Sequence, residues 1–211
     1  DVLTLDIEMP RMDGIEFLKR VMTFHPMPII MVSALTEKGK KITLEALEAG
    51  AVDFVTKPSG SHGGQGLPEM LGELRKKIKM ATRINVASLR AIVSPAKGPK
   101  SFRSESLAET TDKVIAIGAS TGGTTAIRTI LSHLPADTPG IVIVQHITPG
   151  FTTMFAERLN EVSEMKVLEA KDGDRIISGQ VLIAPSNCQM QVRRTGGFYY
   201  VDCKDSPAVG G

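Results

Sequence analysis

The sequence predicts an α/β protein with two doubly wound parallel-sheet domains joined by a linker. Short apolar runs alternate with helical patterns in residues 1–58, and the same alternation returns from Lys113. This alternation is typical of parallel sheets whose connecting helices cover both faces. Residues 94–111 are rich in Pro, Ser, Lys and Glu and hold few large apolar side chains, as interdomain linkers do. We therefore place the domains at 1–93 and 112–211.

Three strands and three helices are expected in the first domain. Each strand is a short apolar run, and each helix shows apolar residues spaced three or four apart. The last helix, from Leu67 to about Val93, is basic, and its apolar side is expected to hold Leu71, Leu74, Ile78 and Met80. The strands are Val2–Leu5, Ile29–Val32 and Val52–Val55, and the earlier helices follow the Asp13-Gly14 turn and precede Gly50.

Two strand–helix pairs and several shorter strands are expected in the second domain. One strand leads into Ser120 and the next ends at His146, and each is followed by a helix with an apolar face. Three shorter strand-like pieces follow, around Val167, at Val181–Ala184 and at Phe198–Val201.

Composition limits the classes of function. The chain is 42% hydrophobic and 23% charged, as soluble globular proteins are. Its basic surplus lies in residues 59–111, with 9 basic and 4 acidic side chains. We interpret this as a solvated basic helix or linker, and expect no nucleic-acid binding, because only 4% of residues are aromatic and could stack on bases.

The cysteine count and the hydropathy indicate a cytoplasmic location. Cys188 and Cys203 are too few for a disulfide framework and have no metal-ligating partners at useful spacing. No apolar run reaches the length of a membrane span, so we expect no membrane insertion. The chain begins inside a strand pattern and stops without a clear ending, and we interpret it as a fragment of a longer protein.

Polar residues end the three strands of the first domain. Asp6, Ser33 and Lys57 each follow an apolar run, and parallel strands bring such ends to one edge of the sheet. Single polar strand ends usually only meet solvent. A carboxylate, a hydroxyl and an ammonium together favour phosphoryl chemistry, because the carboxylate can attack phosphorus while the others bind its oxygens.

The same residues lie in longer motifs. Asp6–Gly14, Val32–Ala34 and Ala49–Pro58 resemble the phosphoacceptor loop and the later motifs of response-regulator receiver domains. The resemblance implies a receiver that is truncated at its N-terminal end.

The receiver resemblance implies a role for each motif residue. Asp6 would be phosphorylated by a chemotaxis histidine kinase, Ser33 would hydrogen-bond the phosphoryl group and Lys57 would pair with it. Phe54 would occupy the aromatic switch position. Mg²⁺ would be held by Asp6 and by the main-chain carbonyl of Glu8, with further acidic ligands on a strand that precedes the chain.

Ser120 and His146 form a second pair of strand-end residues. Small residues around Ser120 fit a nucleophile elbow, where the chain turns sharply and exposes a hydroxyl. The spacing of Gly118, Ser120 and Gly123 also fits a dinucleotide-binding loop, although serine replaces its middle glycine. His146, on the adjacent strand end, is placed to accept the serine proton, and the backbone N–H of Thr121 to stabilise an oxyanion.

These stretches resemble the catalytic domain of chemotaxis protein-glutamate methylesterases. The matching motifs are Ile117–Gly123, Val144–His146, Pro149–Asn160 and Ile183–Pro185. The resemblance implies a truncated Rossmann-like esterase domain whose catalytic serine and histidine lie in the first two motifs. It also implies a triad carboxylate beyond Gly211.

Together the motifs imply a phosphorylation-regulated serine hydrolase of bacterial chemotaxis. Its substrates would be glutamate methyl esters on methylated chemoreceptors, and the family is also associated with deamidation of receptor glutamines. The alternative is a receiver coupled to a non-catalytic, nucleotide-binding signalling domain.

Overall fold

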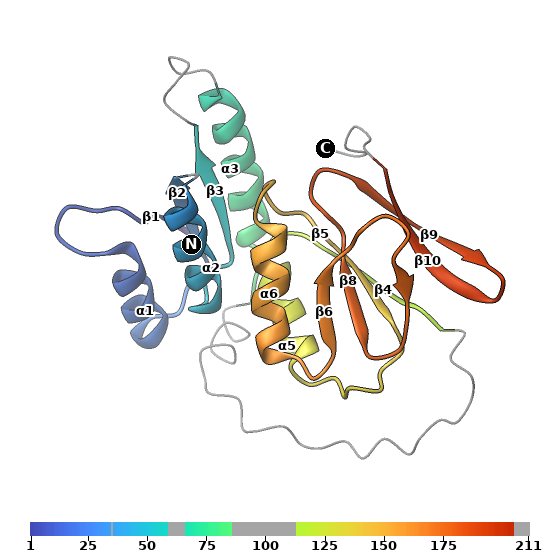
Figure 1. The fold of residues 1–211 in the computed structure, drawn as a ribbon. Helices are drawn as coiled ribbons and strands as arrows, with labels where there is room; N and C mark the ends of the chain where they lie inside the picture. The colour runs from blue at the N-terminus through green and yellow to red at the C-terminus, as the bar shows by residue number, and fades with distance from the viewer. Residues whose placement is uncertain (35, 59–65, 86–112, 205–211) are drawn as a thin grey trace. The chain divides into compact units, whose positions relative to one another are not determined.

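Two compact units divide the chain, Asp1–Lys97 and Gly98–Gly211 (Figure 1). The computed structural model describes four stretches, residues 1–34, 36–58, 66–85 and 113–204. Each unit has its own parallel sheet, so the predicted α/β class is confirmed. The expected linker, residues 94–111, lies outside the described stretches, and the proposed domain boundaries stay a prediction.

Unit 1 contains a three-stranded parallel sheet in the order β1-β2-β3. The central strand, β2, is an apolar run that is buried almost throughout, as strands covered on both faces are. The strands are β1 (Leu3–Asp6), β2 (Ile29–Ala34) and β3 (Asp53–Lys57), and the helices are α1 (Gly14–Phe24), α2 (Glu37–Glu48) and α3 (Leu67–Ala81).

Asp13 and Gly14 determine where α1 begins and how closely it packs against the end of β1. The Asp13 carboxylate accepts a hydrogen bond of 2.9 Å from the backbone N–H of Ile15 and so caps the helix. A Cβ at Gly14 would lie 2.2 Å from the carbonyl oxygen of Asp6, so only glycine fits there. The start of α1 is therefore packed directly against the end of β1.

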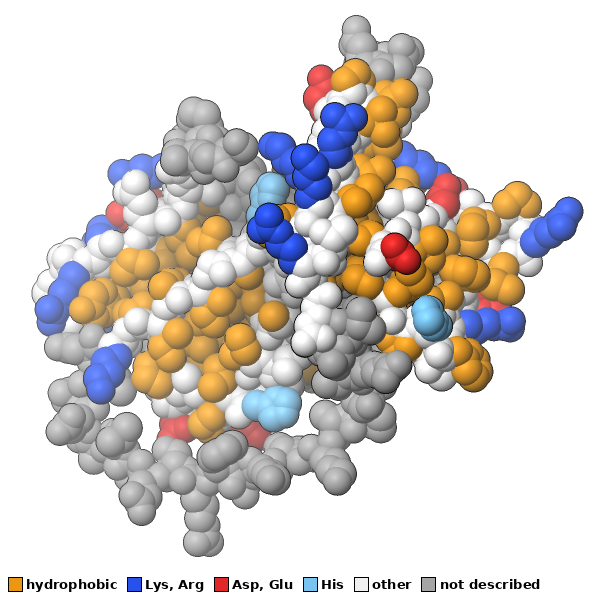
Figure 2. Space-filling model, turned by 180° about the vertical axis from the view of Figure 1, so that it is seen from behind, with side chains coloured by type: hydrophobic (Ala, Val, Ile, Leu, Met, Phe, Trp, Pro, Cys, Tyr) orange, Lys and Arg blue, Asp and Glu red, His pale blue; other side chains and the backbone are white. Residues whose placement is uncertain are grey.

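Helix α3 differs from the expectation in length and in its buried face. It ends at Ala81 instead of near Val93, with Thr82 as its C-cap, and a turn follows. Leu71 and Met80, expected on the apolar side, are 47% and 48% exposed. Figure 2 shows basic side chains beside this exposed apolar surface.

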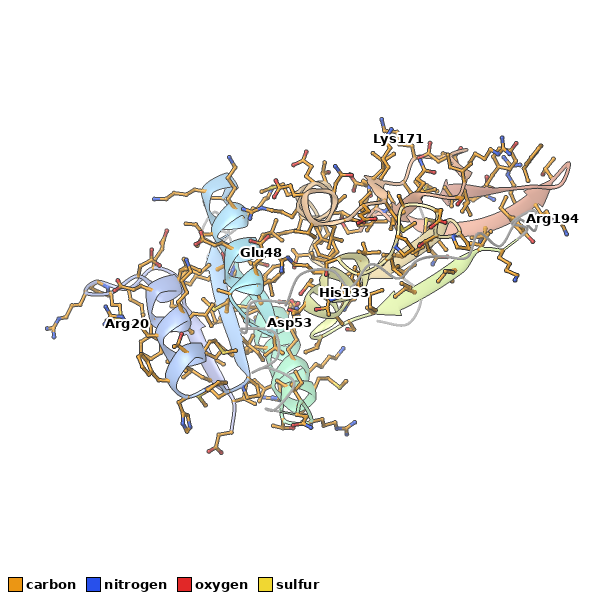
Figure 3. All side chains as sticks on the ribbon, turned by 90° about the horizontal axis from the view of Figure 1, so that it is seen from below. Arg20, Glu48, Asp53, His133, Lys171 and Arg194 are labelled. Carbon is orange, nitrogen blue, oxygen red and sulfur yellow. The ribbon has the colours of Figure 1, made fainter. Side chains whose placement is uncertain are left out.

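A lysine of this basic helix is buried. Lys77 is 7% exposed, and its Nζ donates to Asp53 Oδ1 at 2.9 Å and to the carbonyl oxygen of Phe54 at 2.6 Å. Asp53, labelled in Figure 3, lies at the start of β3. Glu73 adds an ion pair of 2.9 Å from the preceding turn of α3. The buried pair therefore holds α3 against β3.

Unit 2 contains a four-stranded parallel sheet in the order β4-β5-β8-β6. Within the described residues β4 lies at an edge of this sheet and pairs only with β5. No helix in the described stretches combines the length and hydrophobicity that a membrane crossing requires. The elements are β4 (Ile115–Ala119), α5 (Gly123–Leu131), β5 (Ile141–Gln145), α6 (Thr152–Val162), β6 (Lys166–Glu169) and β8 (Gln180–Ile183).

A small antiparallel sheet in the order β7-β10-β9 completes unit 2, and the sequence analysis predicted only part of it. It consists of β7 (Arg175–Ile176), β9 (Gln189–Thr195) and β10 (Phe198–Lys204). Gly196 and Gly197, both with positive φ, form a two-residue hairpin turn, which is a recognisable hairpin signal. Ile176 and Val201 of this sheet pack on Val142 and Leu182 of the parallel sheet.

Replacing Lys77 with Met should destabilise unit 1. The substitution leaves the buried Asp53 carboxylate without its counter-charge, and we expect a loss of about 3 kcal/mol in the free energy of unfolding. Urea denaturation followed by circular dichroism measures this loss. Lys79→Met, on the exposed side of α3, is the matched control and should change stability by less than about 0.5 kcal/mol. Equal effects of both substitutions would contradict the assigned role of the buried pair.

Candidate functional site

Two of the three predicted phosphoryl-site residues meet at the carboxyl edge of the unit 1 sheet. Asp6 ends β1 and Lys57 ends β3, and Lys57 Nζ lies 2.6 Å from Asp6 Oδ2. Both side chains are 38% exposed, so the pair is open to solvent. The other carboxylate oxygen, Oδ1, accepts a bond of 3.1 Å from the backbone N–H of Glu8. The arrangement presents a positioned carboxylate beside an ammonium.

The third residue, Ser33, faces a different neighbour. The residue is 1% exposed, and its hydroxyl lies 2.6 Å from Thr43 Oγ1 on α2 and 3.5 Å from the carbonyl oxygen of Gly39. No hydrogen bond in the described stretches joins it to Asp6 or Lys57. Phe54 is 2% exposed.

The donor atoms near Asp6 suit Mg²⁺ in kind. Mg²⁺ takes oxygen ligands and is usually held by one or two carboxylates together with waters and phosphate oxygens. Asp6 offers one carboxylate and Glu8 a main-chain carbonyl, which are the two ligands that the sequence predicts. Among the described residues, no three Asp, Glu, His or Cys side chains gather as a metal site. Asp6 and Glu8 therefore provide only part of a Mg²⁺ ligand set.

In unit 2, Ser120 and His146 lie at neighbouring strand ends. The register pairs Ala119 with Gln145, and the next residues along the two strands are Ser120 and His146. The backbone N–H of His146 donates to the carbonyl oxygen of Ala119 at 3.0 Å, which ties the two ends together. Both side chains are exposed, and no hydrogen bond joins them in the described part of the chain.

The turn after Ser120 delivers the chain into α5. Gly122 has φ 77°, a left-handed conformation that favours glycine, and Gly123 N donates to the Ser120 carbonyl oxygen at 2.7 Å. Gly118, which the elbow pattern also includes, has open space around it and is not required by crowding. The first backbone N–H groups of a helix are unpaired and carry partial positive charge. The Ser120 side chain therefore lies beside potential oxyanion donors.

Gln145 is a buried residue that sequence reasoning missed. It is 7% exposed, and its Nε2 donates to the carbonyl oxygens of Ser120 and His146, both at 3.0 Å. Its Oε1 is buried without a partner in the described residues, and such an unmet acceptor costs about 1–3 kcal/mol. The available signal was a polar side chain at the end of a strand that is otherwise apolar.

The aspartates of unit 2 are bonded away from His146. Asp202 pairs with Arg193 at 2.8 Å, and Asp172 accepts from the backbone N–H of Cys203 at 2.8 Å. Asp174 accepts from the backbone N–H of Lys171, also at 2.8 Å. Among the described residues, no carboxylate forms a hydrogen bond with the His146 ring.

Two families match the chain. The family described as response regulator receiver domain matches residues 1–63, and the family described as CheB methylesterase matches residues 115–209. The two matches fall in different units and contain the two pairs of strand-end residues.

Curated relatives match across the whole chain. The protein-glutamate methylesterase/protein-glutamine glutaminase of Syntrophotalea carbinolica is 57% identical over 213 residues, which covers 100% of this chain and 60% of the relative. The protein of the same name from Salmonella typhimurium is 47% identical over 99% of this chain and 58% of its own length. The chain thus spans about 60% of the length of these relatives.

Two solved structures resemble parts of the chain. The Thermotoga maritima CheB methylesterase catalytic domain covers 48% of this chain and 54% of its own, with 36% identity and a TM-score of 0.46. The response regulator domain of Thermotoga maritima CheB covers 40% of this chain and 63% of its own, with 50% identity and a TM-score of 0.36.

Cys203 is a poor nucleophile in the folded protein. Burial, together with a side-chain hydrogen bond that the thiol makes to the neighbouring Cys188, raises the pKa of the Cys203 thiol to about 12. Cys203 therefore stays protonated at neutral pH, and the thiol is much less nucleophilic than the thiolate.

Alkylation should test this protection of Cys203. With iodoacetamide at pH 8, we expect Cys203 of the folded protein to react at least tenfold more slowly than a free cysteine of ordinary pKa. Mass spectrometry of peptides after timed quenching gives the rate, and the same protein unfolded in urea is the control. A rate equal to that of the unfolded chain would show that the thiol is not protected.

Proposed function

Because the chain belongs to the family that joins a response regulator receiver domain to a CheB methylesterase domain, we propose that it acts as a phosphorylation-regulated serine hydrolase. Its substrates are methyl-esterified glutamates on chemoreceptors, and the names of the relatives extend the proposal to deamidation of glutamines. The observation that carries the proposal is the adjacent placement of Ser120 and His146 at the carboxyl edge of the sheet.

Acylation is the first half of the proposed reaction. The Ser120 oxygen attacks the ester carbonyl carbon while His146 takes the hydroxyl proton. The carbonyl oxygen becomes an oxyanion, which the N–H of Thr121 and the start of α5 stabilise. When the tetrahedral intermediate collapses, the bond to the methoxy group breaks, and His146 returns its proton so that methanol leaves.

Deacylation repeats the same steps with water. His146 removes a proton from water, the resulting oxygen attacks the acyl carbon, and the Ser120 oxygen leaves with the proton from His146. The products are free enzyme and a glutamate side chain, whose carboxylic acid releases its proton to solvent. With a glutamine substrate, ammonia takes the place of methanol, and the acyl intermediate is identical.

Control of this reaction is assigned to the Asp6–Lys57 pair. An Asp6 oxygen attacks the phosphorus of a phosphohistidine on the kinase, and the histidine nitrogen leaves. Lys57, already 2.6 Å from Asp6, remains paired with the phosphoryl oxygens. Asp6 and the main-chain carbonyl of Glu8 would hold Mg²⁺, which would supply positive charge to the phosphoryl group during transfer. Ser33 turns from Thr43 toward the new oxygens, and Phe54 responds to that movement as the switch residue.

Replacing Ser120 with Ala should abolish methanol release. We expect kcat for release from methylated receptor membranes to fall by a factor of about 10³ to 10⁶, because the nucleophile is lost. The full-length protein is assayed beside Ser132→Ala, a serine at the C-terminal end of α5, which should keep the parent rate. Release by Ser120→Ala at the parent rate, or a rise in melting temperature with added nucleotide, would favour the non-catalytic alternative.

Replacing Asp6 with Asn should abolish activation by phosphorylation and leave basal release intact. The amide cannot form the acyl phosphate, so acetyl phosphate with Mg²⁺ should raise methanol release by the parent only. Incorporation of labelled phosphate gives an independent readout. Glu45→Gln, a surface carboxylate that pairs with Lys19, is the matched control and should still be activated. Equal activation of Asp6→Asn would place the phosphoacceptor elsewhere.

A further inference from the structure

The carboxamide of Gln145 lies beneath the serine turn and uses both of its N–H groups there. One donates to the carbonyl oxygen of Ser120 and the other to the carbonyl oxygen of His146, each at 3.0 Å. A primary amide has two donor hydrogens, so the donor capacity of the side chain is filled. The bonded partners are the main-chain groups of the two residues that carry the proposed chemistry.

The orientation of this amide is determined by its neighbours. Exchanging its nitrogen and oxygen would set a carbonyl oxygen against two other carbonyl oxygens, which repel it. Packing holds the group as well, since a Cβ at Gly123 would lie 2.2 Å from Gln145 Oε1 and 2.6 Å from the Cβ of Ala119. The side chain therefore fills the space beneath Gly123 in one orientation.

The carbonyl of Ser120 has two donors on it. Gln145 Nε2 approaches from β5, and the N–H of Gly123 approaches from the same turn at 2.7 Å. No peptide bond among the described residues is cis, and in a trans peptide the C=O and the following N–H point in opposite directions. Fixing the Ser120 carbonyl toward buried Gln145 thus directs the Thr121 N–H the other way.

The Thr121 N–H is available to a substrate. No hydrogen bond within the described part of the chain uses it, and the adjacent Ser120 side chain is exposed. An N–H on the peptide group next to the nucleophile is placed to meet the oxyanion that forms when the nucleophile attacks. The direction of this one peptide group therefore decides whether the donor is aimed correctly.

We propose that Gln145 is a positioning residue that locks the Ser120–Thr121 peptide group so that the Thr121 N–H faces the developing oxyanion. The inference rests on the proposed function and assigns a part to a residue that does not touch the substrate. The hydrogen bond from Gln145 to the carbonyl oxygen of His146 gives Gln145 the same positioning role for the proposed base. The N–H of His146 is held by Ala119 and its carbonyl by Gln145, so both of its peptide groups are fixed.

The first test is Gln145→Met in the full-length protein, with methylated receptor membranes as substrate. Met has a similar length and no donor, so the peptide group loses one of its two restraints. We expect kcat for methanol release to fall by about 10- to 100-fold with KM changed less than twofold, because the lost interaction acts in the transition state. Affinity for a small alkyl boronic acid, which forms a tetrahedral anion on serine, should fall with kcat.

Gln180→Met is the matched control. Gln180 also has a buried Oε1 without a partner among the described residues, and it lies at the start of β8, at the opposite end of the strands from Ser120. Its substitution should leave kcat and boronate affinity unchanged. A general loss of packing would instead lower the activity of both variants.

The second test is Gln145→Glu, which gives a readout that a structural role would not produce. The protonated carboxyl can donate one of the two bonds, whereas the carboxylate can donate neither and is repelled by both carbonyl oxygens. The ratio of variant to parent kcat should therefore fall as pH rises through the pKa of the introduced carboxyl, which burial and the carbonyl oxygens raise. Taking the ratio removes the titration of His146, which both proteins share.

The outcomes separate this inference from the proposed function. A parent kcat in Gln145→Met, or a ratio for Gln145→Glu that does not change with pH, would overturn the role of Gln145. If Gln145→Met does not fold, the pH-dependent ratio of Gln145→Glu decides alone. If the parent itself releases no methanol, or releases it without Ser120, the proposed function fails before Gln145 is tested.

Discussion

The parallel pairing of β4 with β5 is the constraint on which the rest of the candidate site depends. Because Ala119 lies opposite Gln145, the two strands end together and Ser120 emerges beside His146. A slip of one residue would turn every side chain of a strand to the other face of the sheet. Gln145 would then leave the interior, and the serine turn would lose its support. The register of this one strand pair therefore aligns Ser120, His146 and the buried amide of Gln145.

The alternation of strands and helices determines which residues reach the edge of each sheet, so the sequence alone could predict their positions. Apolar runs that end in polar residues were sufficient to place Asp6 and Lys57 on one edge, and Ser120 and His146 on another, while their chemical roles remain predictions. Ser33 shows where such reasoning stops. Its position on β2 followed from the pattern, but the direction of its hydroxyl depends on Thr43, a residue of α2 that no local rule connects to it.

Features that depend on contacts between distant residues could not be predicted. A lysine in a basic helix is expected in solvent, and Lys77 is buried because Asp53 and the carbonyl of Phe54, more than twenty residues away, receive its charge. Gln145 in unit 2 is buried for a similar reason to Lys77. Its amide donates hydrogen bonds to the carbonyl oxygens of Ser120 and His146 at two strand ends. Strand β9 was missed for a local reason. Its polar residues and arginines hide the apolar pattern of a strand, although the Gly196-Gly197 turn that follows is a hairpin signal.

Among the described residues, β4, the strand that leads into Ser120, lies at an open edge of its sheet. Within the described residues its outer row of N–H and C=O groups has no partner strand, and apolar side chains near it are exposed, Ile115 by 38% and Val144 by 52%. Open edges of this kind are templates for strand addition by another chain. A strand added at this edge would lie beside β4, the strand that leads directly into Ser120.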